Sequence, residues 1–359
     1  MHKLITAVLF LLLFFSSCEK DLGESPSLNP INPSGDSRLL LVGNEGSFGT
    51  NTASLSVINL STDAVTNNVY RASNSQDVGD VLQSITRIND LYYMVVNNSN
   101  KILVTDTNFK KIAIISGLTS PRYITAVSET RAYVSSLFND KIYIIDLIAH
   151  SKISEIQMDY NWTEEMLLVR DATGNNLYVC ENDTAVNYIT KLDVVTNQIV
   201  DRIPIAGYSP SKIVEASNGN LWILSGNNFY NKVSTLTELN PITNQIVSSF
   251  SFPSNYTTQQ LAIGPSNEKY VTVVDYTTNA YGVFKFSASA TSFPASFFIH
   301  QTSTENFYGI SVDPLNGDLY VSDSKGFTQA GAVNKYSSSG VLSKSWTAAI
   351  GPSSFYFVD

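Results

Sequence analysis

A short strand-like segment built around a large apolar residue recurs along the whole chain and restricts the fold more than any other feature. Successive copies lie 41 to 51 residues apart. A period of about 40–50 residues with short strands is typical of a β-propeller that has one blade per repeat. The copies centre on Leu41, which is degenerate, and on Tyr92, Tyr133, Tyr178, Trp222, Tyr270 and Tyr320.

The second repeat shows the internal plan of a blade most clearly. Four strand-like runs, at residues 81–88, 91–96, 102–106 and 111–115, are separated by turns rich in Asn, Asp and Thr. Such turn residues between apolar runs indicate antiparallel hairpins. The sequence therefore predicts four antiparallel strands in each blade.

The third strand of several repeats ends in an acid or amide. Examples are Asn59, Asp106, Asp146 and Asp193. Asp and Asn side chains bond to the backbone of the turn that follows them. We therefore expect turn capping from these residues rather than catalysis.

The phase of the repeat predicts how the ring closes. The folded region opens on a second-strand pattern at residues 39–43 and ends on residues 352–358, which match the first-strand pattern of residues 121–124. The C-terminal strand should therefore complete the first blade and remove the open sheet edges. We predict an all-β, seven-bladed propeller; six or eight blades, or a pair of β-sandwiches, are the alternatives.

The N-terminal segment has the pattern of an export signal. Lys3 precedes an apolar run at residues 4–15, which is followed by Ser16, Ser17 and Cys18. Twelve apolar residues are too few for a membrane span, which needs about 20, so a signal peptide over 1–17 is preferred to an uncleaved anchor helix. Residues 18–37 are rich in Pro, Ser and Gly and predict a flexible tether. The propeller is expected over residues 38–359.

Composition argues against several functions. The net charge is −9, and an acidic chain does not bind nucleic acid or anionic membranes through its overall field. Its three His and two Cys are not paired in metal-ligand spacings, and no nucleophile motif is evident. We expect no catalytic residues, no metal and no cofactor. Cys180, in a strand pattern, is expected to be a small buried hydrophobe.

One end of the predicted ring carries the richest loops. We call this the top face: it bears the loops between second and third strands and those that lead from each blade to the next. Aromatic and amide side chains together are typical of a ligand or protein interface. The aromatic residues of these loops are Phe48, Phe138, Tyr160, Trp162, Tyr208, Phe229, Tyr230, Tyr256, Tyr276 and Phe327.

Three motifs in the first blades carry a family resemblance. They are residues 44–49 (NEGSFG), 95–99 (VVNNS) and 121–124 (PRYI). With them the chain resembles YncE-like, YVTN-type seven-bladed propellers, and more narrowly surface lipoproteins of Bacteroidota that bind cobalamin and pass it to a TonB-dependent transporter. Cys18 after Ser-Ser resembles a bacterial lipobox, which implies lipidation of Cys18. The following Glu19-Lys20-Asp21 resembles a surface-export signal, which implies an outer-membrane lipoprotein facing the cell exterior.

The resemblance implies a corrinoid ligand on the top face, a transporter partner, attachment to the membrane by the lipid anchor only, and a monomer or a one-to-one complex. Amide side chains can pair with the amides around a corrin ring, and aromatic residues can cover it. Arg122 has an equally good structural explanation. The expected contacts are Asn44, Glu45, Phe48, Asn98, Arg122, Trp162, Asn182, Tyr230 and Tyr276.

Two other functions compete with ligand capture. A non-catalytic adhesion or scaffold propeller would bind protein or glycan through the same loops. A propeller lyase or lactonase would need convergent His, Glu or metal ligands, which the sequence pattern does not provide.

Overall fold

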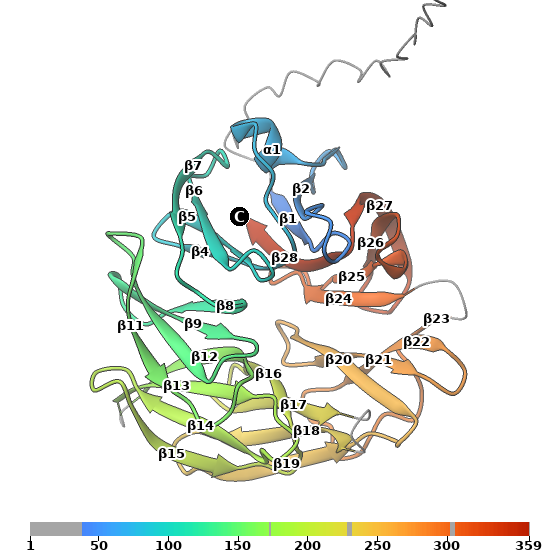
Figure 1. The fold of residues 1–359 in the computed structure, drawn as a ribbon. Coiled ribbons are helices and arrows are strands. Elements are labelled where there is room, and N and C mark those ends of the chain that lie inside the picture. Colours follow the sequence, from blue (N-terminus) through green and yellow to red (C-terminus); the bar gives the residue numbers. More distant parts are fainter. Residues whose placement is uncertain (1–37, 172–173, 228–231, 302–305, 359) are drawn as a thin grey trace, which may run out of the picture.

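The seven predicted blades are present. A computed structural model describes residues 38–171, 174–227, 232–301 and 306–358. These residues form seven four-stranded antiparallel sheets arranged around a central axis (Figure 1). The chain is therefore a seven-bladed β-propeller, as the repeat predicts. The expected signal peptide (1–17), tether (18–37) and lipidated Cys18 lie outside the described residues.

The four strands of each blade follow one another from the channel outward in the same order. Blade 1 holds β28 (Pro352–Val358), β1 (Leu39–Asn44), β2 (Ser54–Asn59) and β3 (Val65–Thr66); blade 2 holds β4 (Leu82–Ile88), β5 (Leu91–Val96), β6 (Lys101–Thr105) and β7 (Lys111–Ile115). Blade 3 holds β8 (Pro121–Ala126), β9 (Arg131–Ser136), β10 (Lys141–Asp146) and β11 (Ser151–Gln157); blade 4 holds β12 (Thr163–Asp171), β13 (Gly174–Glu181), β14 (Tyr188–Asp193) and β15 (Gln198–Pro204). Blade 5 holds β16 (Pro210–Glu215), β17 (Leu221–Asn227), β18 (Lys232–Asn240) and β19 (Gln245–Ser251); blade 6 holds β20 (Tyr256–Ile263), β21 (Lys269–Asp275), β22 (Ala280–Phe286) and β23 (Ile299–Gln301). Blade 7 holds β24 (Phe307–Val312), β25 (Leu319–Asp323), β26 (Ala330–Tyr336) and β27 (Leu342–Ile350).

The ring closes as the phase of the repeat predicts. The C-terminal strand β28 pairs antiparallel with β1, with Leu39 opposite Val358 and Val42 opposite Phe355. The two ends of the propeller thus share one blade, and neither leaves an unpaired inner edge.

The repeated aromatic residues build the core between blades. Tyr133, Tyr178 and Tyr270 are completely buried, and Trp222 is 3% exposed. Each apolar cluster joins neighbouring blades; Tyr133 of β9, for example, packs in one cluster with Leu177 of β13. Burial of such large side chains is the main stabilising contribution that the repeat can make.

The acids and amides that end the third strands cap the following turns, as predicted. The Asp146 carboxylate accepts the backbone N–H of Ile148 and Ala149, both at 2.8 Å. The Asn240 side-chain oxygen does the same for Ile242 and Thr243, at 2.9 and 3.1 Å. The repeated turns are therefore fixed by local side-chain bonds.

One loop holds an element that the sequence pattern does not indicate. A short helix, α1 (Val69–Asn74), precedes blade 2. Its Val69 and Tyr70 are buried in the cluster shared by blades 1 and 2, so packing stabilises a helix too short to be stable alone. No helix of the described residues is long and apolar enough to cross a membrane.

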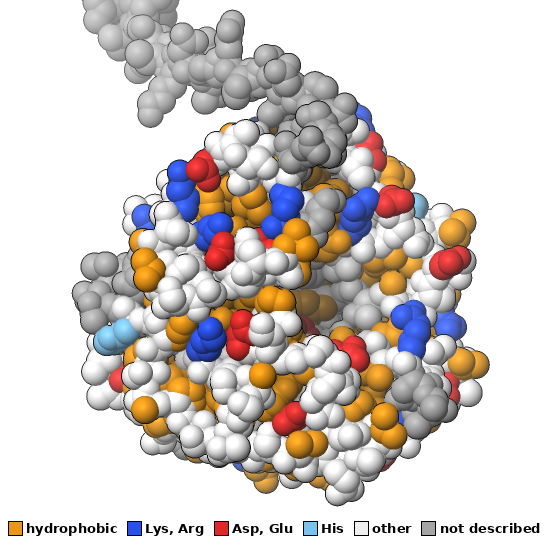
Figure 2. All heavy atoms as spheres, turned by 180° about the vertical axis from the view of Figure 1, so that it is seen from behind, with side chains coloured by type: hydrophobic (Ala, Val, Ile, Leu, Met, Phe, Trp, Pro, Cys, Tyr) orange, Lys and Arg blue, Asp and Glu red, His pale blue; other side chains and the backbone are white. Residues whose placement is uncertain are grey.

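Figure 2 shows the molecule from behind the view of Figure 1. The ring is hollowed at its middle, and positive and negative side chains are scattered over this face rather than gathered by sign. The inner strands of the blades converge on this hollow (Figure 1).

Candidate functional site at the mouth of the central channel

Every inner strand carries an irregularity near its first residues, at the top face. In β8 the register with β9 shifts between Pro121 and Ile124, and in β12 the register with β13 shifts between Thr163 and Met166. The inner strands of the other five blades pair with a shift at the equivalent end. A bulge re-aims side chains and breaks the strict alternation of a strand. Consecutive residues can therefore reach the channel together.

An Arg–Glu pair joins the inner strands of blades 3 and 4 at this end. The Arg122 guanidinium of β8 donates to both carboxylate oxygens of Glu164 of β12, at 2.8, 3.0 and 3.2 Å. Arg122 also donates to the Gln83 side-chain oxygen of β4, and the Trp162 indole donates to Glu164 at 2.5 Å. The Arg122 and Glu164 side chains are only 18% and 4% exposed. The fork-shaped guanidinium suits this two-point contact.

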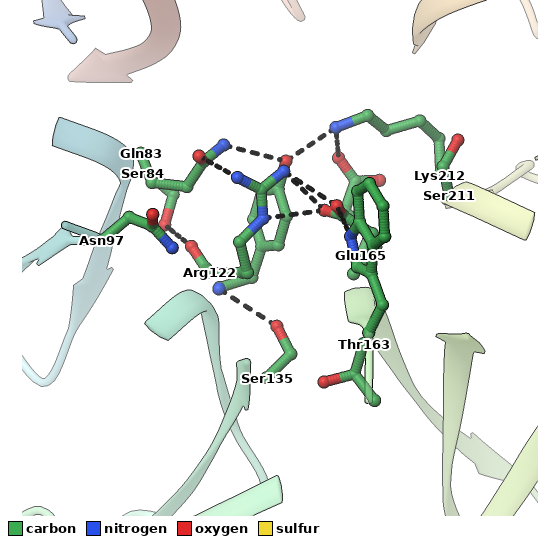
Figure 3. A network of polar contacts seen from close by, with 12 residues as sticks. Gln83, Ser84, Asn97, Arg122, Ser135, Thr163, Glu165, Ser211 and Lys212 are labelled. Carbon is green, nitrogen blue, oxygen red and sulfur yellow. Dashed lines mark hydrogen bonds and ion pairs between the residues drawn. The ribbon is translucent and has the colours of Figure 1, made fainter. Parts of the chain in front are cut away.

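A second ion pair continues the network across the channel (Figure 3). The Lys212 ammonium of β16 lies 3.1 Å from the Glu165 carboxylate of β12 and donates to the Tyr123 hydroxyl of β8 at 2.7 Å. The Gln83 amide donates to the same hydroxyl at 3.4 Å. The network thus joins the inner strands of blades 2, 3, 4 and 5. We call Gln83, Arg122, Tyr123, Glu164, Glu165 and Lys212 the mouth network.

Neighbouring carboxylates keep the two cations protonated. Burial alone would lower the pKa of Arg122, but Glu164 and Tyr123 raise it above its ordinary value. Burial likewise opposes the charge of Lys212, and Glu165 with Tyr123 raises the pKa of that ammonium. Both side chains therefore remain positive at any physiological pH.

Glu45, a carboxylate that forms no ion pair with another described residue, lies between blades 1 and 7 at the mouth. Glu45, which follows β1, accepts a hydrogen bond from the Tyr308 hydroxyl of β24, at 3.2 Å to one oxygen and 3.4 Å to the other. Burial raises the pKa of Glu45 to about 7, although Arg122 and the Tyr308 bond lower it in part. Glu45 can therefore change its protonation state near neutral pH.

The described part of the chain contains no group of three or more His, Cys, Asp or Glu that could hold a metal ion. Cys180 is fully buried, and burial raises the pKa of its thiol well above the ordinary value. A thiol with so little thiolate is a packing residue rather than a nucleophile.

The whole propeller corresponds to one known sequence family. A family model described as "Domain of unknown function (DUF5074)" matches residues 40–356. The chain belongs to the DUF5074 family. No curated protein matches its sequence.

Solved structures similar to this DUF5074 propeller share its fold at low sequence identity. A candidate 6-phosphogluconolactonase from Bacteroides fragilis has a TM-score of 0.63 and 12% identity, over 91% of this chain and 99% of that one. A quinonprotein alcohol dehydrogenase-like protein from Bacteroides thetaiotaomicron has a TM-score of 0.64 and 13% identity, over 88% and 77%. Hydrazine synthase of Kuenenia stuttgartiensis has a TM-score of 0.60 and 14% identity, over 76% and 88%. At these identities the similarity establishes the fold alone.

Three of the expected ligand contacts belong to the mouth of the DUF5074 propeller. Arg122 is part of the mouth network, Trp162 donates to its Glu164, and Glu45 lies between blades 1 and 7 at the mouth. Arg122 therefore has the structural role that the sequence left open, and its partial exposure also leaves it within reach of a ligand.

Four further expected contacts lie in the surrounding loops. Phe48 and Tyr276 are 76% and 69% exposed. The Asn98 amide donates to Asp80 at 2.5 Å, and the backbone N–H of Asn182 donates to the Trp162 carbonyl at 2.8 Å. Their contact with a ligand stays a prediction. Tyr230 lies outside the described residues.

Asn44 is placed differently from the expectation. It is completely buried, and its amide donates to the Ser54 carbonyl and the Ser56 hydroxyl at 3.1 and 2.9 Å. This side chain is used to hold β1 against β2.

The sequence did not point to most of the mouth network. Gln83, Tyr123, Glu164, Glu165 and Lys212 occupy the first residues of inner strands, where alternation predicts only one channel-facing residue in two. A usable signal was the occurrence of charged residues at the start of three successive inner strands, at Arg122, Glu164-Glu165 and Lys212.

Proposed function

We propose that this propeller is a surface lipoprotein that captures a ligand at the top mouth of its channel. One observation carries the proposal: charged side chains from several blades gather at one end of the channel. They are Glu45, Arg122, Glu164, Glu165 and Lys212. Placing buried charges together is costly unless they are paired, and their concentration at a single mouth is typical of a binding site.

The surroundings of the mouth support capture of a large ligand. Phe48, Phe138 and Tyr276, in three top-face loops, are 76%, 73% and 69% exposed. Exposed aromatic rings around a polar centre can cover a flat ligand while the centre pairs with its polar groups. Cobalamin or another corrinoid, with amide groups around its ring, is the ligand that we propose, on the resemblance of the first three blades.

We also propose a location in the cell and a partner for this protein. The lipobox-like Cys18 would anchor the protein in the outer membrane, facing outward, and a TonB-dependent transporter would accept the ligand. The three fold neighbours described above bear enzyme-type names, but their low identity transfers no activity. We therefore propose a binding protein of the YncE-like type, rather than an enzyme or an adhesion scaffold.

Calorimetric titration of the purified full-length protein with cyanocobalamin tests this function. We expect binding at micromolar protein, weakened at least tenfold by the double substitution Phe48→Ala with Tyr276→Ala. Ile148→Ala is a matched control because Ile148 is 72% exposed and lies in a turn at the opposite end of its blade. Absence of heat and of any change in the visible spectrum would overturn the corrinoid proposal.

A further inference from the structure

Blade 7 contains a polar cavity that does not belong to the channel mouth. Its volume is 540 Å³, within the range of about 300–1,000 Å³ that small-molecule sites occupy. It is bordered by the strand ends and loops around β25, β26 and β27. Its polar lining residues are Asn306, Asp323, Lys325, Gln329, Asn334 and Ser345.

Asn334 is the most informative of these residues. It is 3% exposed, and strand alternation puts it on the same face of β26 as Tyr336, which packs against blade 6. Its side-chain amide lies in the wall of the cavity, where a ligand can reach it. An amide both donates and accepts hydrogen bonds, so it suits a ligand that carries both kinds of group.

Equivalent positions in other blades are built differently. Asn334 pairs with Val321, the residue after the repeated aromatic, and Thr190 and Phe284 pair with the corresponding Val179 and Val271. Thr190 donates its hydroxyl to the Glu181 carboxylate, and Phe284 packs in an apolar cluster. Blade 7 alone of these three places an amide there that faces a cavity.

Asp323 supplies a buried acceptor beside this amide. It is 2% exposed, and its Oδ1 accepts the backbone N–H of Asn306 and of Lys325, both at 2.9 Å. Oδ2 makes no such bond within the described residues. These bonds hold the two loops at the cavity in place while one carboxylate oxygen stays available.

The rim of the cavity adds both hydrogen-bond donors and hydrogen-bond acceptors. Lys325, Gln329 and Ser345 are exposed, and Lys325 forms no ion pair with another described residue. An ammonium only donates, a carboxylate only accepts, and the amides and hydroxyl do both. The cavity thus offers closely spaced donors and acceptors with very little apolar lining.

From this lining we infer that the blade 7 cavity binds a saccharide of one or two rings. Each sugar hydroxyl can donate one hydrogen bond and accept others, so it can pair with both the donors and the acceptors of this lining. An apolar ligand is disfavoured because it would form no hydrogen bond with the Asn334 amide. A divalent cation is disfavoured because the cavity offers it a single carboxylate, and the Lys325 ammonium would repel it. An inorganic anion is disfavoured because the Asp323 carboxylate would repel it. None of the cavity's lining residues belongs to the mouth network, although Lys325 and Gln329 lie in the same top-face loop as Phe327.

Saturation-transfer NMR of the full-length protein with glucose, galactose, N-acetylglucosamine and galacturonic acid tests the inference. We expect at least one sugar to receive saturation, with its dissociation constant raised tenfold or more by Asn334→Ala. Gln329→Ala should weaken binding as well, and because Gln329 is exposed this variant keeps the fold intact. Asn108→Ala, in an exposed turn of blade 2, should change nothing.

Two results would overturn the inference: no transfer to any of the four sugars, or binding that neither Asn334→Ala nor Gln329→Ala alters. The cyanocobalamin titration of the same variants separates the two sites. Both variants should bind cyanocobalamin like the wild type if the channel mouth is its site, and failure of one ligand leaves the other measurement intact.

Discussion

At the channel mouth, two oppositely charged side chains form a largely buried ion pair. The Arg122–Glu164 pair brings together side chains that are 18% and 4% exposed. Removing one partner of a buried ion pair leaves an uncompensated charge, which typically costs about 3–5 kcal/mol, whereas apolar replacement of both is often neutral. The pair is therefore a specific arrangement rather than a source of net stability.

We predict that Arg122→Met lowers the free energy of unfolding by about 3 kcal/mol. The double variant Arg122→Met with Glu164→Leu should recover most of this loss because no charge is left unpaired. Urea denaturation of the wild type, the two single variants Arg122→Met and Glu164→Leu, and the double variant measures the effect. A double variant as unstable as the sum of its two single variants would contradict this explanation.

Glu45 should make stability depend on pH. Its pKa is about 7 in the folded protein and 4.5 in an ordinary environment, so folding favours the protonated form. The contribution is fully present below pH 4.5 and is lost as the pH rises through about 7. Because Glu45 is partly exposed, we expect a loss of about 2 kcal/mol between about pH 5 and 8.

Denaturation of wild type and Glu45→Gln at several pH values isolates this effect. The variant should be close to the wild type at mildly acidic pH and more stable than it at mildly alkaline pH. A stability difference that stays constant over this range would show that Glu45 does not titrate there.

At the scale of elements, the strands and their pairing followed from local sequence. The second strands were evident because each has a large side chain that buries between blades, such as Tyr133, Tyr178 or Tyr270. Closure by β28 followed from the phase of the repeat. The helix α1 was not evident, because the two buried residues that stabilise it, Val69 and Tyr70, are followed by an ordinary polar loop sequence.

The contacts within the mouth network could not be predicted from local sequence patterns. Arg122 and Glu164 are 42 residues apart, Tyr123 and Lys212 are 89 apart, and Glu45 and Tyr308 are 263 apart. No local pattern links such residues; the ring closure and the bulges of the inner strands bring them together. Sequence alone therefore pointed to Glu45, Arg122 and Trp162, but not to Glu164, Glu165, Lys212 or Tyr308.

The capped turns give a prediction for a single element. Asn240→Ala should remove two side-chain-to-backbone bonds in the turn between β18 and β19 and cost about 1 kcal/mol. Thr243→Ala in the same turn is the control, since Thr243 takes part through its backbone N–H. Equal effects of the two substitutions in urea denaturation would argue against side-chain capping.

For the whole molecule, the proposed attachment to the membrane depends on lipidation of Cys18. Cys18→Ala should abolish incorporation of labelled palmitate and release the protein from the membrane fraction. Cys180→Ala is the matched control, because the Cys180 thiol is completely buried in blade 4. Labelling that persists in Cys18→Ala would exclude lipidation at this residue.

We propose that the top mouth of the channel is the ligand-binding site of the propeller. Hydrogen–deuterium exchange with and without saturating cyanocobalamin tests it most directly. We predict slower exchange in the top-face loops at residues 45–53, 137–140 and 276–279, and no change in the opposite-face turns at residues 89–90 and 147–150. Protection confined to the opposite face, or no protection in any segment, would contradict binding at the mouth.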